Sequence, residues 1–252
     1  MKIGVIGVGV VGTAIKRGFE DLGHEVKIHD IKFNTSIRDV IDTDILYLCL
    51  PTNSNEDGSC DIEQILKTLK ALSNYKGIIA VKSTIIPGTY NKLKKLFDIE
   101  RLCLVPEFLR EVHAYEDFTK NHNVLIIGAN NDKCIDVVKK CHGDYPKNIL
   151  ILKPEEAEFV KYFSNVFKAV KITFANSFGK ICDKFNVDYD KVLLAYALES
   201  VAETAYLKYS KEFRGFGGMC LPKDVNALSC LVNNKNINVD LFKFIIDENK
   251  KF

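Results

Sequence analysis

Short apolar runs rich in valine and isoleucine alternate with amphipathic stretches over the first 150 residues. The apolar runs predict seven strands, at residues 2–6, 25–29, 44–50, 77–82, 101–105, 123–127 and 148–152. Stretches with helical spacing separate several of them, at 11–22, 62–72, 88–96 and 132–140. Such alternation with apolar strands is typical of a parallel sheet covered by helices on both faces. The polar, turn-rich segment 53–61 is predicted to be a surface loop.

The pattern changes at Pro154. From Glu155 to about Phe185 no strong helix breaker occurs, and apolar residues recur every three or four positions, at Phe159, Phe163, Phe167, Val170 and Phe174. This spacing predicts one long amphipathic helix, roughly 45 Å long, with Pro154 in its first turn. Shorter helices are expected at 189–198, 201–209, 224–231 and 239–249. We therefore expect a doubly wound parallel α/β domain over residues 1–153 and a smaller all-helical domain over residues 154–252.

Composition excludes several classes of protein. The 252 residues include 35 Lys and Arg against 33 Asp and Glu, so net charge does not favour a nucleic acid or a membrane surface as partner. No apolar run approaches the roughly 20 residues that span a bilayer, and the N-terminus lacks the basic leader of a signal peptide. The eight cysteines form no CxxC pair, which favours reduced thiols in a cytoplasmic protein over disulfides or a zinc site.

A glycine-rich motif follows the first predicted strand. Gly7, Gly9 and Gly12 fit GxGxxG between a strand and a helix, and the second predicted strand ends next to Asp30. The glycines allow a pyrophosphate to approach the backbone, and the helix N-terminus supplies free N–H donors. An acidic residue at position 30 would bind ribose hydroxyls and repel a 2′-phosphate. We therefore predict a Rossmann-type NAD site; the alternative is a glycine-rich turn in a domain without a dinucleotide.

Four further segments carry candidate chemistry. KSTIIPGT (82–89) and PEFLRE (106–111) each follow a predicted strand, at the edge where doubly wound sheets bind ligands. Lys161 and Asn165 are four residues apart and share a helix face. Taken singly, PEFLRE is more typical of a solvated loop, and the Lys161–Asn165 pair is more typical of an exposed helix face. GFGGMCLPKD (215–224) surrounds Cys220 with glycines, a proline and an aspartate, which indicates backbone held close to a ligand and a thiol that cations can activate.

These segments, with EAEFVKYFSNVFKAVKITFAN (156–176), resemble in order the signatures of the UDP-glucose/GDP-mannose dehydrogenase family. Members of the family oxidise C6 of a nucleotide sugar to a carboxylate, pass two hydrides to two NAD⁺ molecules, and supply polysaccharide biosynthesis. The resemblance implies a short form that lacks the family's C-terminal UDP-binding domain, with weaker nucleotide-sugar binding. Met219 replaces the family's usual serine, and residues 198–213 contain no arginine where the family carries one that reaches a neighbouring subunit's substrate.

The resemblance also implies roles for particular residues. Cys220 would capture the intermediate aldehyde as a thiohemiacetal, which is oxidised to a thioester and hydrolysed. Around the reacting centre, the resemblance places Lys161 and Asn165 at the reacting oxygen, Asp224 and Glu107 at the hydrolytic water, and Thr84 at water or cofactor. The NAD side would be lined by Val11, Thr52, Glu111 and Lys223. The sugar nucleotide would contact the backbone of Phe108, Leu109, Arg110 and Gly217.

Two alternatives to this function stay open. A single-step β-hydroxyacid or phosphogluconate-type dehydrogenase also places Lys and Asn four apart on a helix, but it has no use for a thiol nucleophile. The chain could instead be a non-catalytic NAD-binding half of a split enzyme. A further expectation concerns assembly: the phenylalanine stripe of helix 155–185 is hard to cover within a helical domain of about 100 residues. In the family this helix lies at a dimer interface, so we predict a homodimer; the alternative is burial by the segments that follow.

Overall fold

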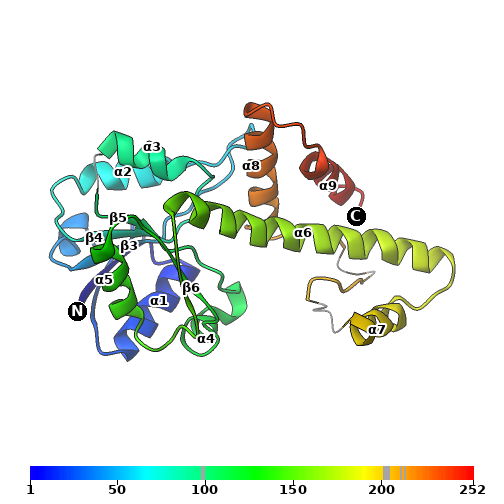
Figure 1. Ribbon diagram of the computed structural model, residues 1–252, viewed down its shortest axis with the longest axis horizontal. Helices are drawn as coiled ribbons and strands as arrows, with labels where there is room; N and C mark the ends of the chain where they lie inside the picture. The colour runs from blue at the N-terminus through cyan, green and yellow to red at the C-terminus, as the bar shows by residue number, and fades with distance from the viewer. Residues whose placement is uncertain (98–99, 201–204, 211, 213) are drawn as a thin grey trace. The chain divides into compact units, whose positions relative to one another are not determined.

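The computed structural model describes residues 1–97, 100–200, 205–210, 212 and 214–252. Its strands are β1 (Lys2–Ile6), β2 (Glu25–His29), β3 (Ile45–Leu48), β4 (Ile78–Val81), β5 (Leu102–Leu104), β6 (Leu125–Gly128) and β7 (Ile149–Leu152). Its helices are α1 (Val10–Asp21), α2 (Glu63–Ala71), α3 (Thr89–Phe97), α4 (Ala114–Thr119), α5 (Asp132–His142), α6 (Pro154–Lys184), α7 (Tyr189–Ser200), α8 (Leu221–Asn234) and α9 (Leu241–Asn249). The described residues also form two short 3₁₀ turns, η1 (Ile37–Asp39) and η2 (Glu111–His113). Figure 1 shows the helices and strands along the chain.

The strands form one sheet in the order β2-β1-β3-β4-β5-β6-β7. Five of the six neighbouring pairs are parallel, as the predicted parallel sheet requires, and β5 and β6 depart from it by pairing antiparallel through Leu104 and Gly128. Antiparallel pairing needs no helical crossover, and the connection between β5 and β6 carries the 3₁₀ turn η2 and the six-residue α4. The doubly wound class itself is confirmed. The strand order reverses between β1 and β3: the chain adds β2 on one side of β1 and β3 on the other, and such a switch point is where doubly wound sheets bind ligands.

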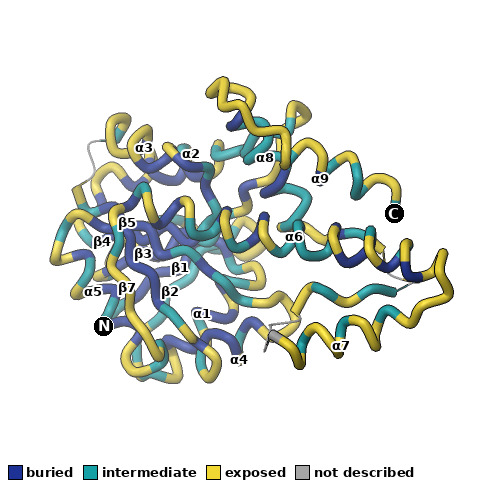
Figure 2. Tube along the Cα trace, turned by 45° about the vertical axis from the view of Figure 1, so that its right-hand side comes forward, coloured by how far each residue is buried: buried dark blue, intermediate teal, exposed yellow. Residues whose placement is uncertain are grey.

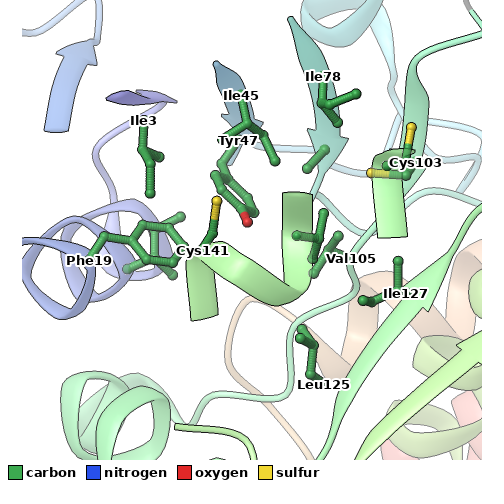
Figure 3. Packing of buried hydrophobic residues seen from close by; sticks show 14 of the residues in the cluster. Ile3, Phe19, Ile45, Tyr47, Ile78, Cys103, Val105, Leu125, Ile127 and Cys141 are labelled. Carbon is green, nitrogen blue, oxygen red and sulfur yellow. The ribbon is translucent and has the colours of Figure 1, made fainter. Parts of the chain in front are cut away.

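Alternate strand residues bury opposite faces of the sheet. One core combines Ile3 and Tyr47 with apolar residues of α1, α4 and α5, as Figure 3 shows for part of the cluster. The other combines Leu46 and Leu48 with residues of α2 and α3 and with Ala157 of α6. Both faces are therefore covered, as expected for nearly continuous apolar strands.

Residue contacts divide the chain into two units. The first unit consists of residues 1–53 and 61–161, and the second of residues 54–60 and 162–252. The second unit has its own core, in which Val166 and Ala169 of α6 pack with Val225 of α8 and Ile245 of α9. The predicted loop 53–61 is a loop, closed by a bridge between Ser54 and Cys60, and its residues 54–60 belong to the second unit.

The helical half differs from the sequence prediction in one segment. Residues 205–209 were expected to be helical, but they form a turn followed by irregular chain; residues 201–204 lie outside the described residues. Tyr206 has a φ of +68°, a left-handed conformation that a right-handed helix excludes. The long helix is confirmed as α6, with 31 residues. Figure 2 shows many of its positions exposed, and within the described chain no helix has both the length and the apolar character needed to cross a membrane.

Candidate active site

The glycine-rich turn connects β1 to α1, and the surroundings of its three glycines differ. Gly7 has a φ of +91°, and a side chain there would meet the backbone of Cys49. A Cβ on Gly12 would collide with the carbonyl oxygen of Gly7, whereas one on Gly9 would point into open space. No side chain caps the start of α1 in this fully described segment. Exposed backbone at an uncapped helix N-terminus is suited to an anionic group such as a pyrophosphate.

Asp30 follows β2 beside this turn. Its Oδ2 accepts a hydrogen bond from the backbone N–H of Val8 at 2.6 Å, and its Oδ1 accepts one from Lys32 at 2.8 Å. Burial acts to raise the pKa of Asp30, but the amides of Lys32 and Val8 outweigh it, and the pKa lies below its usual value. Asp30 is therefore an ionised acceptor fixed against the glycine turn, as ribose recognition requires.

Glu107 follows β5 and is buried, with its carboxylate paired to Lys82 at the end of β4. Lys82 Nζ lies 2.7 Å from Glu107 Oε2, and the Lys82 side chain is only 1% exposed. Glu107 Oε1 also accepts a hydrogen bond from the backbone N–H of Phe108 at 2.8 Å. Burial acts to raise the pKa of Glu107, but the Lys82 charge and hydrogen bond lower it below its usual value. Glu107 is therefore held as a carboxylate.

Hydroxyl groups fix the loop between β4 and α3. Ser83 Oγ accepts a hydrogen bond from the backbone N–H of Leu50 at 2.9 Å and donates to its carbonyl at 2.8 Å. Thr52 is buried, and its hydroxyl donates to the Thr84 carbonyl at 2.7 Å. Thr52 and Thr84, both predicted near the cofactor, are thus in contact, and Thr52 acts on the loop that carries Thr84.

Glu158 of α6 holds the other end of this loop. Its side chain is 3% exposed, and its two carboxylate oxygens accept hydrogen bonds from the backbone N–H groups of Gly88, at 2.7 Å, and Tyr90, at 2.6 Å. Burial raises the pKa of Glu158 to about 7, although these amides favour the charged form. A cavity of about 10 Å³ lies beside it, with Thr84 and Lys161 in its lining. That is room for roughly one water molecule.

Lys161 lies on α6, three residues after Glu158. Its ammonium group lies 5.4 Å from the ring centre of Phe108, within the range of a cation–π contact. In the first unit, the structure therefore brings Lys161 together with one of the residues predicted to contact the sugar nucleotide.

Arg110 is fixed by an acid rather than left free for a ligand. Its Nε and Nη2 donate to Asp117 at 2.8 and 2.6 Å, and its backbone N–H donates to the same carboxylate at 3.0 Å. This side-chain pairing lowers the pKa of Asp117 to about 2. The pair fixes the turn that ends the PEFLRE segment, with Glu111 exposed at the start of η2.

The second unit carries a buried polar cluster centred on Asp224. Asn165 Nδ2 donates to Asp224 Oδ2 at 2.5 Å, and Lys223 Nζ lies 2.5 Å from Oδ1. Asp224 is fully buried and Asn165 is 4% exposed. The N–H of Asp224 donates to the carbonyl of Cys220 at 2.9 Å, so the cluster lies one helical turn after the thiol. Lys223, which was predicted to line the NAD side, forms an ion pair with Asp224 through its ammonium group.

Cys220 stands immediately before α8. All eight cysteines are described and carry free thiols, and Cys220 is the exposed one. A Cβ added to Gly217 or Gly218 would meet nothing within 4 Å. The thiol therefore follows open backbone that a ligand can approach.

The predicted site residues divide between the units. The first unit holds Gly7, Gly9, Val11, Gly12, Asp30, Thr52, Thr84, Glu107, Phe108, Leu109, Arg110, Glu111 and Lys161. The second holds Asn165, Gly217, Cys220, Lys223 and Asp224. Sequence reasoning assigned no role to Lys82 or Glu158. Two features of the sequence could have indicated them: Lys82 directly follows four apolar strand residues, and Glu158 lies three residues before Lys161.

A larger depression, of about 780 Å³, lies at the opposite ends of the strands. Lys2, Asp44 and Gly77, which begin or precede β1, β3 and β4, are part of its lining. Because doubly wound sheets bind ligands at the carboxyl ends of their strands, this depression is not part of the candidate site.

The fold, the glycine turn and Asp30 together define a dinucleotide-binding protein of the Rossmann class. Two models of the UDP-glucose/GDP-mannose dehydrogenase family match the chain, the NAD binding domain over residues 26–145 and the central domain over residues 155–251. The chain belongs to this family, as its motifs predicted. The cofactor is NAD, and the first unit fits it: Gly9 leaves the space at the start of α1, and Asp30 is the ionised acceptor.

Individual relatives agree with this assignment. A UDP-glucose 6-dehydrogenase of Haloferax volcanii is 28% identical over 99% of this chain and 69% of its own length. One of Rickettsia bellii is 30% identical over 83% of this chain and 50% of its own. The solved UDP-glucose dehydrogenase of Pyrobaculum islandicum superposes with a TM-score of 0.91 at 27% identity, over 99% of this chain and 68% of its own. The chain thus spans half to about two-thirds of the length of these relatives.

The Lys82–Glu107 ion pair leads to a prediction about stability. Lys82→Met should lower the free energy of unfolding at neutral pH by about 3–5 kcal/mol, because it leaves a buried carboxylate unpaired. In the native protein the pKa of Glu107 lies below its usual 4.5, so the stabilisation is present above that pH and is lost on acidification. In the variant, burial raises that pKa, and stability should instead increase as the pH falls from neutral towards 4.5.

Urea denaturation at several pH values measures both effects. The control is Lys82→Met combined with Glu107→Gln, which removes both charges and should recover most of the lost stability. Equal losses in the single and double variants would contradict the ion-pair explanation.

Glu158 leads to a second prediction, of opposite sign. Its pKa is about 7 in the folded protein against a usual 4.5, so its contribution to stability is full below 4.5 and is lost as the pH rises to about 7. In thermal unfolding, the difference between the native protein and Glu158→Gln should therefore change across this interval. Glu156→Gln, an exposed acid on the same turn, should leave the pH dependence unchanged. Parallel curves for the native protein and Glu158→Gln would refute the raised pKa.

Proposed function

We propose that the chain catalyses the NAD-dependent oxidation of a nucleotide sugar at C6, in the manner of UDP-glucose 6-dehydrogenases. The observation that carries this proposal is the exposed Cys220 thiol, placed one helical turn before a buried Asn165–Asp224–Lys223 cluster. An accessible nucleophile next to fixed polar groups is the arrangement that covalent catalysis requires. The names of the relatives support UDP-glucose as the substrate class.

NAD binding is the task of the glycine turn and Asp30. Gly7, Gly9 and Gly12 admit the pyrophosphate, Asp30 accepts from ribose hydroxyls, and Thr52 holds the Thr84 loop. NAD⁺ supplies the hydride acceptor. Further residues that we assign to the cofactor side are Val11, Thr84, Glu111 and Lys223.

Oxidation of an alcohol to an acid removes two hydrides. The thiol allows this to occur in two steps, with the second hydride lost from a covalent intermediate. The first hydride and a proton leave the alcohol to give an aldehyde, to which the Cys220 sulfur adds as a thiohemiacetal. Loss of the second hydride gives a thioester. Water then displaces the sulfur, which yields the carboxylate and restores the thiol.

We assign charge stabilisation and the handling of water to side chains from both units. Lys161 and Asn165 stabilise negative charge on the reacting oxygen. Asp224 orients or activates water for the hydrolysis. Glu107 assists that step as a proton acceptor, a role for which Lys82 keeps it ionised. The backbone of Phe108, Leu109, Arg110 and Gly217 holds the sugar nucleotide.

The two alternative functions predict different outcomes. A single-step hydroxyacid dehydrogenase would use Lys161 and Asn165 but would not need an exposed thiol before α8. A non-catalytic NAD-binding half would bind NAD and release no NADH without another chain. We place the reaction in the cytoplasm, in keeping with eight free thiols, and its sugar-acid product would supply polysaccharide biosynthesis.

The number of NADH molecules released per sugar tests the function. Purified protein with NAD⁺ and a panel of UDP- and GDP-sugars should release two NADH per sugar, and Cys220→Ser should lower turnover by about three orders of magnitude. Cys230→Ser, a partly buried thiol in α8, is the matched control and should leave the rate unchanged. One NADH per substrate with an active Cys220→Ser variant would favour the single-step dehydrogenase. NAD binding without NADH release would favour the non-catalytic half.

We also propose that the chain forms a homodimer through α6. Phenylalanines along this helix are strongly exposed, with Phe163 at 75%, Phe174 at 59% and Phe185 at 74%. Exposed aromatic side chains in a continuous row indicate a protein interface. We favour a second copy of the chain as the partner that covers these phenylalanines, because in the family this helix lies at a dimer interface.

Light scattering tests the dimer. The native protein should have twice the chain mass of 28.5 kDa, and Phe163→Glu with Phe174→Glu should reduce it to one chain, because two charges cannot be buried unpaired at the interface. Phe33→Glu, at an exposed phenylalanine outside α6, should stay dimeric. A monomeric native protein at micromolar concentration would refute the proposal.

A further inference from the structure

One side chain holds both backbone polar groups of Phe216. Asn249, the last residue of α9, accepts a hydrogen bond from the Phe216 N–H at 2.7 Å and donates one to the Phe216 carbonyl at 3.0 Å. Phe216 is only 6% exposed, so these groups have little access to water. A buried peptide unit that must be satisfied is therefore paired with a side-chain amide that matches its donor and acceptor.

The neighbouring residue is fixed in the same way. The N–H of Gly215 donates to Asn176 Oδ1 at 3.2 Å, and Asn176 of α6 is 1% exposed. Gly215 has a φ of +71°, and a Cβ there would lie 2.6 Å from Asn249 Oδ1. Glycine at this position thus permits both the backbone conformation and the approach of the Asn249 side chain.

These contacts secure the start of the segment that leads to the proposed nucleophile. Gly217 and Gly218 have open space where side chains would be, and Met219 is 75% exposed, so packing does little to restrain them. Beyond Cys220 the chain is secured again by α8, through the buried contact of Asp224 with Asn165. The position of Cys220 therefore depends on two attachments, one of which is Asn249.

We propose that Asn249 is a positioning residue for Cys220: it anchors the Gly215–Phe216 backbone, with Asn176, so that the thiol is presented in one place. The inference rests on the proposed function, since it concerns the nucleophile of that reaction. It assigns Asn249 no contact with substrate. A side-chain amide is required because Asp can accept from the Phe216 N–H but cannot donate to the carbonyl.

The test combines a spectroscopic and a kinetic measurement on Asn249→Ala, Asn249→Asp and the control Lys243→Ala, an exposed position on the same helix. A nitroxide is attached to Cys220 in a background whose partly exposed cysteines, Cys49, Cys60 and Cys230, are serine. Asn249→Ala should increase nitroxide mobility and accelerate exchange of the Phe216 amide by about tenfold. Asn249→Asp should lie between Ala and the native protein, and Lys243→Ala should match the native protein.

In the unlabelled protein, kcat for NADH release should fall by roughly tenfold in Asn249→Ala, because the thiol is less often in position. The Kd for NAD⁺ should stay the same, because the glycine turn and Asp30 belong to the other unit. Faster Phe216 exchange with unchanged nitroxide mobility and kcat would overturn the proposal, since Asn249 would then be only a local structural contact. Full turnover by Cys220→Ser would refute the proposed function instead, and the nitroxide spectra would still decide whether Asn249 positions Cys220.

Discussion

A carboxylate that leaves water needs a partner to replace its hydration, and this constraint organises the candidate residues of both units. In the first unit, Lys82 compensates Glu107 from the end of the neighbouring strand. In the second, Asn165 and Lys223 together compensate Asp224. Each acid is thereby fixed in position, since moving it would leave a charge buried without a partner.

The kind of partner decides the charge state of each acid. A full positive charge beside Glu107 outweighs burial and keeps its pKa below the usual value. Glu158 is also buried but has only backbone amides as partners, and its pKa rises to about 7. Two glutamates of one unit therefore differ in protonation: Glu107 is a carboxylate at neutral pH, and Glu158 can gain a proton near neutral pH. This division of acid and base character by environment is common in active sites.

Much of the fold could be predicted from local pattern, because buried parallel strands and amphipathic helices leave a strong periodic signal. The bounds of β1 and β2 agree with the prediction, and those of the other strands differ by a few residues. The prediction failed where no periodicity exists. Six residues are too few to reveal α4, the antiparallel pairing of β5 and β6 depends on residues distant in sequence, and one left-handed residue, Tyr206, prevents a helix over 205–209.

By itself, the sequence determined the order of the elements, the glycine turn with its acidic partner, the family motifs and the position of the thiol, because each is a property of residues close together in the chain. Only the tertiary structure decided that Lys82 pairs with Glu107, that Glu158 secures the loop of Thr84, and that Asn249 holds Phe216. These contacts join residues 25 to 70 positions apart. The physical reason is that burial and hydrogen bonding depend on which distant groups meet, and folding alone brings them together.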